Sequence, residues 1–190
     1  MSGKKNVEVS QRYFSTRDLA FVAVICAMIT AVVIVSHRLA APFLCIPGAI
    51  QVSSALFVGI VTAIGLAKVK KVGTFTLIGI IRGLIAGFII PAMPILFLAV
   101  AAGGIFADGV TKLFRADYSE EKFIISACGC YTFARAVVAM GMTAVLGLPR
   151  AILSPYVILA VSLVCFALGG IGGYVGTRIA KELKEAGVMG

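Results

Sequence analysis

The stretch Leu19–Ser36, LAFVAVICAMITAVVIVS, contains eighteen consecutive uncharged residues between Asp18 and His37. A helix needs roughly 20 mostly apolar residues to cross the hydrocarbon core of a bilayer. Over the whole chain of 190 residues, 61% are apolar and 13% are charged, whereas soluble domains average roughly 45–50% and about 25%. This composition excludes a water-soluble globule and an intrinsically disordered chain, and it predicts an integral membrane protein.

Five more apolar stretches follow, and prolines divide the longer ones. Pro42 and Pro47 interrupt the uncharged stretch after the first span, and Pro91 and Pro94 divide a later stretch that is too long for one helix. The sequence predicts an all-α integral membrane protein, a six-transmembrane-helix bundle in a single membrane domain. The six expected spans cover residues 18–36, 48–67, 73–90, 95–112, 123–147 and 154–177.

The basic residues indicate how this bundle is oriented. Thirteen Lys and Arg side chains flank the predicted spans on one face, whereas only Arg38 and Arg150 flank them on the other. Because basic loops stay in the cytoplasm, both termini are expected there, in a multi-pass protein of the cell membrane. The net charge of +9 therefore mainly reflects the orientation of the protein in the membrane, and the basic residues also attract anionic lipid. We expect no nucleic-acid partner.

The sequence lacks the motifs of the common enzyme classes. It has no GxxxxGK[ST] phosphate loop, no HExxH or GxSxG motif and no paired acid cluster. The five cysteines form neither a disulfide framework nor a zinc pattern. We therefore expect that the chain is not an enzyme and holds no metal site and no cofactor of its own.

Three charged residues fall inside predicted spans, where a charge is unfavourable by at least about 2.5–3.5 kcal/mol. Arg82 and Asp108 lie on neighbouring predicted helices, and we favour a structural ion pair between them. Arg135 lies near the middle of the fifth span, with no obvious acid to pair with it. It is either a ligand for an anionic group or a structural residue, and both roles stay open.

The other candidate binding residues lie near the predicted outer side. Besides Arg135, we expect substrate contacts from His37, Arg38, Tyr131, Arg150 and Tyr156. His37 is either a helix-end cation favoured by the helix dipole, the reading we prefer, or a metal or haem ligand. Tyr156 near an interface is also typical of a membrane anchor. The excess of arginine in this region indicates a carboxylated or phosphorylated substrate.

Alanines repeat every four residues in the first span, at Ala23, Ala27 and Ala31. Small side chains at this spacing let helices approach closely inside a membrane, where no hydrophobic effect separates protein from lipid. We expect this face of the first helix to contact a partner protein.

Several features together carry a family resemblance. A short basic head leads into Ser15-Thr-Arg-Asp18 and the alanine repeat, and the six predicted spans occupy only 190 residues. The central run Ala67-Lys-Val-Lys-Lys-Val-Gly-Thr-Phe-Thr-Leu-Ile-Gly79 and the later Gly104-Ile-Phe-Ala-Asp108 complete the pattern. The chain resembles the substrate-binding S components of energy-coupling factor (ECF) transporters, and it is similar to their Trep_Strep subgroup.

The resemblance implies a function and a set of partners. An S component captures a vitamin or other micronutrient from the outside. Ala23, Ala27 and Ala31 match the motif that docks on a transmembrane T subunit, which two ATPase subunits drive with ATP. The family's pockets share no motif, so the resemblance implies only a zone, formed by the outer loop after the first span and the outer halves of spans four to six.

Two other functions stay open. A stand-alone carrier or channel acting as a homo-oligomer needs a membrane-embedded acid for ion coupling, and Asp108 is the sole candidate. An intramembrane enzyme needs a nucleophile and a base, for which the sequence offers no credible pair. The S component is therefore the favoured interpretation.

Overall fold

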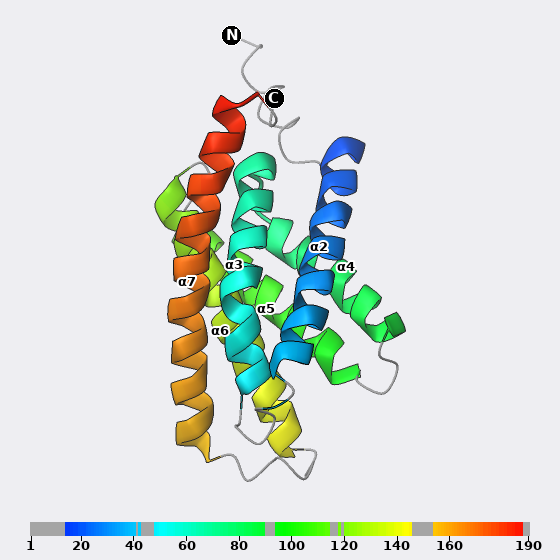
Figure 1. Ribbon diagram of the computed structural model, residues 1–190, viewed down its shortest axis with the longest axis vertical. Coiled ribbons are helices and arrows are strands. Elements are labelled where there is room, and N and C mark those ends of the chain that lie inside the picture. The colour runs from blue at the N-terminus through cyan, green and yellow to red at the C-terminus, as the bar shows by residue number, and fades with distance from the viewer. Residues whose placement is uncertain are drawn as a thin grey trace.

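The computed structural model describes residues 14–40, 42, 48–89, 94–114, 118, 120–145 and 154–187. All regular structure among these residues is helical, and Figure 1 shows the helices as a bundle. The helices are α2 (Thr16–Ala40), α3 (Ala49–Val69), α4 (Thr74–Ile89), α5 (Pro94–Leu113), α6 (Glu121–Val145) and α7 (Pro155–Glu185).

Each helix occupies one of the six stretches that the sequence marks out. Four of them, α2, α3, α6 and α7, are long and apolar enough to cross a membrane. Helix α4 has 16 residues, a length of about 24 Å, which is shorter than a hydrocarbon core of about 30 Å. The prediction of an all-helical membrane protein is confirmed, whereas six crossings and cytoplasmic termini stay predictions.

Local sequence signals explain where the helices begin. Ser15 precedes α2, and its backbone N–H donates to Oδ2 of Asp18 at 3.0 Å while its hydroxyl accepts from the N–H of Arg17 at 3.4 Å. This reciprocal arrangement is a capping box. Helices α5 and α7 begin at Pro94 and Pro155, because proline fits the first helical turn, where a missing N–H breaks no bond.

The first turn of α2 lies at the same end of the molecule as the last turn of α7 (Figure 1). The turn between α3 and α4 also lies there, because Nζ of Lys71 forms an ion pair with Oδ2 of Asp18 at 2.8 Å. Gly73 in this turn has a φ of 100°, which disfavours any residue with a Cβ. Helix α2 is thereby held against the α3–α4 turn.

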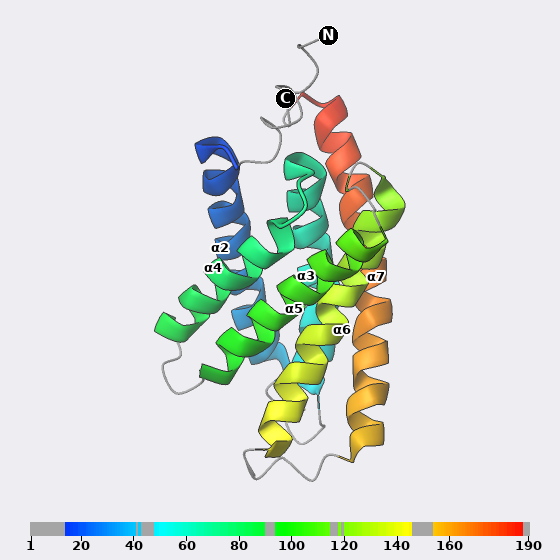
Figure 2. The same cartoon turned by 180° about the vertical axis from the view of Figure 1, so that it is seen from behind.

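Glycines determine how closely the helices pack. Helix α7 lies against α3 and α6, and a Cβ at Gly172 of α7 would overlap the carbonyl oxygen of Leu56 in α3. In the same way, a Cβ at Gly104 of α5 would overlap the backbone of Phe75 in α4. Figure 2 shows that the α4–α5 pair runs obliquely to α2, α3 and α7. Because backbones touch at these points, the register between the helices is tightly specified.

This packing yields a prediction with a matched control. Gly172→Ala should lower the free energy of unfolding by about 1–3 kcal/mol, because the added methyl group meets backbone that cannot move away locally. Gly170→Ala adds the same group where no atom lies within 4 Å, so it should be neutral or stabilising by up to about 1 kcal/mol. Thermal unfolding in detergent, followed by circular dichroism, measures both. Equal effects of the two substitutions would contradict the α3–α7 packing.

Candidate functional site

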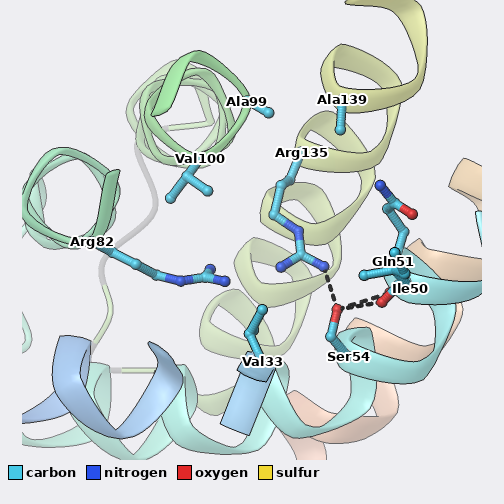
Figure 3. A pocket seen from close by; sticks show the side chains of 9 residues that line it. All are labelled: Val33, Ile50, Gln51, Ser54, Arg82, Ala99, Val100, Arg135 and Ala139. Atoms are coloured by element: carbon cyan, nitrogen blue, oxygen red, sulfur yellow. Dashed lines mark hydrogen bonds between the residues drawn. The ribbon is translucent and has the colours of Figure 1, made fainter. Parts of the chain in front are cut away.

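Five helices meet around a cavity of about 50 Å³. The walls are mostly apolar, and four polar side chains reach into it (Figure 3). The polar residues are Gln51 and Ser54 of α3, Arg82 of α4 and Arg135 of α6, and the apolar ones are Val33, Ile50, Ala99, Val100 and Ala139. Apolar walls with a few converging polar groups are a lining that small-molecule binding sites share.

Arg135 is buried in this wall, with 6% of its surface exposed. Its Nη2 donates to Oγ of Ser54 at 2.7 Å, and the Ser54 hydroxyl in turn donates to the carbonyl oxygen of Ile50 at 2.8 Å. Its Nε is buried and has no hydrogen-bond partner among the described residues. An N–H without a partner on a buried cation is unfavourable, so the hydrogen bonds of Arg135 within the described residues are incomplete.

Arg82 enters the same cavity from the opposite side, and Figure 3 shows both guanidinium groups pointing into the shared space. It is 4% exposed, and its Nη1 donates to the hydroxyl of Tyr131 at 2.9 Å. Tyr131 is fully buried and its ring packs on that of Phe75 at a centroid distance of 5.3 Å. Because Tyr131 lies one helical turn before Arg135, α6 both supplies one guanidinium and positions the other.

The predicted ion pair between Arg82 and Asp108 is wrong. Oδ2 of Asp108 accepts from the backbone N–H of Thr76 at 2.7 Å and from its hydroxyl at 2.8 Å, and Oδ1 accepts from the hydroxyl of Tyr118 at 2.7 Å. The register of α4 against α5 explains why Asp108 does not meet Arg82. In this register Gly83 lies on Phe97 and Gly104 lies on Phe75. Asp108 therefore faces the first turn of α4, where it caps an unpaired N–H.

Tyr118 keeps its proton in this arrangement. Burial, followed by the negative charge of Asp108, holds the pKa of the Tyr118 phenol well above its ordinary value. The hydroxyl therefore stays a donor to Asp108, and it also shares a hydrogen bond of 3.1 Å with Thr111. The carboxylate of Asp108 is thus engaged by side chains and backbone at one end of the bundle.

Among the residues that the structure describes, no carboxylate lies at the level of the cavity. The sequence has no Asp or Glu between residues 19 and 107, and none between residues 122 and 181. Among the described residues, the ion pair between Lys71 and Asp18 is the only one. Two buried cations thus share a cavity without a counter-charge, an arrangement suited to binding an anion.

Of the other predicted site residues, one contacts the arginine pair and three lie away from the cavity. Tyr131 belongs to the arginine pair as the partner of Arg82, although it does not line the cavity. His37 and Arg38 are exposed at the end of α2, and Tyr156 is 84% exposed at the start of α7. The structure brings none of these three to the cavity. Arg150 lies outside the described residues.

Sequence reasoning missed Arg82, Ser54 and Gln51 as cavity residues. For Arg82 a signal existed, because the absence of acids between residues 19 and 107 leaves it without a partner at its own depth. For Ser54 and Gln51 the sequence holds no comparable signal, since polar side chains near a helix start are common. Their position follows from how α3 packs against α6.

The alanines of α2 lie on a face that is exposed in the structure. Ala23, Ala27 and Ala31 are all exposed, whereas Cys26 and Ile29 on the opposite face are fully buried. Exposed Val24 and Met28 extend the same surface. We call this surface the α2 face.

The apolar helices and the charged cavity within them define a helical integral membrane protein. A family model described as "Hypothetical bacterial integral membrane protein (Trep_Strep)" matches residues 16–146, which include α2 to α6. The chain belongs to the Trep_Strep family. No curated protein and no solved structure matches it.

The contacts of Asp108 yield a second prediction. Tyr118→Phe removes the donor to Oδ1 and should lower the free energy of unfolding by about 1–3 kcal/mol, because a buried acceptor is left unpaired. The control is Tyr156→Phe, which removes the same hydroxyl from an exposed side chain and should change stability by less than about 0.5 kcal/mol. Thermal unfolding in detergent compares the two. A neutral Tyr118→Phe would mean that Asp108 does not depend on this bond.

Proposed function

We propose that the chain is the substrate-capture (S) subunit of an ECF-type ABC importer and that it binds an anionic vitamin or other micronutrient from the outside. One observation carries the proposal: Arg82 and Arg135 face one cavity, and no acid in the described part of the chain lies at their depth. A receptor for an anion needs such a preformed positive site, with apolar walls that exclude water.

The position of the cavity supports capture from the outside. Val33 lies in the second half of α2, whereas Ile50 and Ser54 lie in the first turns of α3. The cavity is therefore displaced from the end of the bundle where α2 begins. In the orientation that the basic residues predict, this displacement is toward the outer side of the membrane.

The α2 face is an argument for a partner protein that supplies the energy for ligand release. Release of a tightly bound ligand requires several kcal/mol of differential interaction, for example about 5.5 kcal/mol to reverse a 99:1 population. The sequence has no phosphate-binding loop of its own, so ATP would be used by partner subunits. The exposed alanines of α2 offer a smooth surface on which a T subunit with its two ATPases can dock.

The alternative of a stand-alone carrier gains no support from the contacts of Asp108. A coupling acid must bind and release protons or cations during transport. Asp108 instead accepts hydrogen bonds from Thr76 and Tyr118 and lies at the end of the bundle away from the arginine pair. This environment is that of a structural carboxylate.

The proposal predicts that docking and binding can be separated. Ala27→Trp should abolish co-purification with the T subunit and ATPases and ATP-dependent uptake, because a large ring prevents close helix contact. The uptake assay uses the solute that native mass spectrometry finds on the purified wild-type chain. Binding of that solute to the purified variant should be unchanged, since Ala27 is exposed and remote from the cavity lining.

The matched control is Ala167→Trp, which places the same ring on the exposed side of α7. It should leave both co-purification and uptake intact. Loss of binding and uptake together in Ala27→Trp would contradict a separate docking face. Sustained accumulation of the solute by proteoliposomes that contain this chain alone would overturn the S-subunit proposal.

A further inference from the structure

We propose that the cavity binds a divalent oxyanion, a phosphate group bridged between Arg82 and Arg135. This inference rests on the proposed function, in that the phosphate group is taken to belong to the captured solute. It goes further by assigning the charge of the ligand group and by placing Arg82 among the residues that bind it.

Charge balance is the first argument. Arg82 and Arg135 are both almost fully buried, and both are permanently protonated at physiological pH. A monovalent anion such as a carboxylate would neutralise one guanidinium and leave the positive charge of the other uncompensated at membrane depth. A divalent anion neutralises both, and its two charges match the two that this chain leaves without a carboxylate.

Free hydrogen-bond donors are the second argument. Each guanidinium has five N–H donors, and each makes a single hydrogen bond within the described residues, Arg135 to Ser54 and Arg82 to Tyr131. Nε of Arg135 is one of these donors, since it is buried and has no partner among the described residues. Ser54 and Tyr131 act as positioning residues, because their bonds orient the two groups and leave the other donors for the tetrahedral oxygens of a phosphate.

Size is the third argument. The cavity of about 50 Å³ is larger than the roughly 10–15 Å³ that a single water requires and smaller than the ~300–1,000 Å³ typical of whole-ligand sites. It therefore has room for one oxyanion group, with any attached part of the solute lying outside it. The ligand group is thus small, divalent and rich in acceptors, as a phosphate monoester is.

Binding of methyl phosphate to the wild-type full chain in phosphatidylcholine nanodiscs, measured by calorimetry, tests the proposal. A phosphate monoester loses its second proton near pH 6, so the affinity should rise between about pH 5 and 8 as the dianion forms. Acetate, which never carries more than one negative charge, should bind at least about tenfold more weakly and should show no rise above about pH 6.

The protein's own groups do not produce such a rise. Of the residues that line the cavity, only Arg82 from α4 and Arg135 from α6 are titratable, and α2, α3 and α5 contribute none. Tyr131, Cys26 and Cys165 lie near the two guanidinium groups. Thiols and phenols as a class keep their protons below about pH 8, so a rise between about pH 5 and 8 is the signature of the phosphate monoester itself.

Three variants assign the binding to the arginine pair. Arg82→Gln and Arg135→Gln should each lower the affinity for methyl phosphate at least about tenfold, because each loses a charge-assisted contact. Arg178→Gln removes an equal charge from an exposed side chain on α7, outside the cavity, and should bind as the wild type does. If an arginine variant fails to fold, the wild-type pH profile and the acetate comparison still decide the charge of the ligand.

A second arm distinguishes a solute phosphate from a lipid headgroup. Nanodiscs that contain phosphatidic acid, whose headgroup is also a phosphate monoester, are compared with nanodiscs of phosphatidylcholine alone. Unchanged methyl phosphate affinity assigns the site to a soluble ligand. Competition by phosphatidic acid would confirm the phosphate chemistry and assign its source to lipid.

Three results would overturn the two-arginine phosphate site. They are an affinity that is flat or falls with rising pH, acetate binding as tight as that of methyl phosphate, and an Arg82→Gln variant that binds normally. The outcome is separable from that of the proposed function. Phosphate binding without ATP-dependent uptake would refute the S-subunit role alone, whereas coupled uptake of a solute without a divalent group would refute the phosphate site alone.

Discussion

The central constraint on this molecule is the separation of its buried positive charges from its carboxylates. Arg82 and Arg135 share a cavity in the interior of the helices, whereas the acids that the structure describes inside or beside helices, such as Asp18 and Asp108, lie toward the end where α2 begins. A lone charge at membrane depth is unfavourable by at least about 2.5–3.5 kcal/mol on insertion scales. Within the described residues, each guanidinium is held by one hydrogen bond to a neutral side chain, and the proposed anion site rests on this uncompensated charge.

The packing of the helices determines why the two arginines meet at one cavity. Gly79 and Gly104 let α4 and α5 touch backbone to backbone, and Gly103 lets α5 approach α6 beside Arg135. These contacts fix which residues of α4, α5 and α6 face one another, and so they direct both guanidinium groups into one space. Helix α2 lies on α3 and α4 and leaves its alanines exposed. The bundle thus has an arginine-lined cavity inside and an exposed alanine face on α2 outside.

Sequence patterns predicted the helices well, because apolar length, prolines and the Ser15–Asp18 cap act locally. They also singled out Arg135 as a buried cation and Ala27 as part of an exposed face. They failed for Arg82, because depth along a helix does not specify the rotation and register that bring it opposite Tyr131 rather than Asp108. That register depends on backbone contacts between distant glycines, which spacing within one helix does not encode.

The most direct test of the account is the location of an oxyanion in an experimental structure. Crystals of the protein soaked in arsenate, a heavier analogue of phosphate, would show by anomalous scattering where a divalent tetrahedral anion binds. The account predicts a peak between Arg82 and Arg135, within hydrogen-bond distance of Nε of Arg135, and its loss in crystals of Arg135→Gln. Ordered arsenate elsewhere, with both guanidinium groups paired instead to groups of the protein, would contradict it.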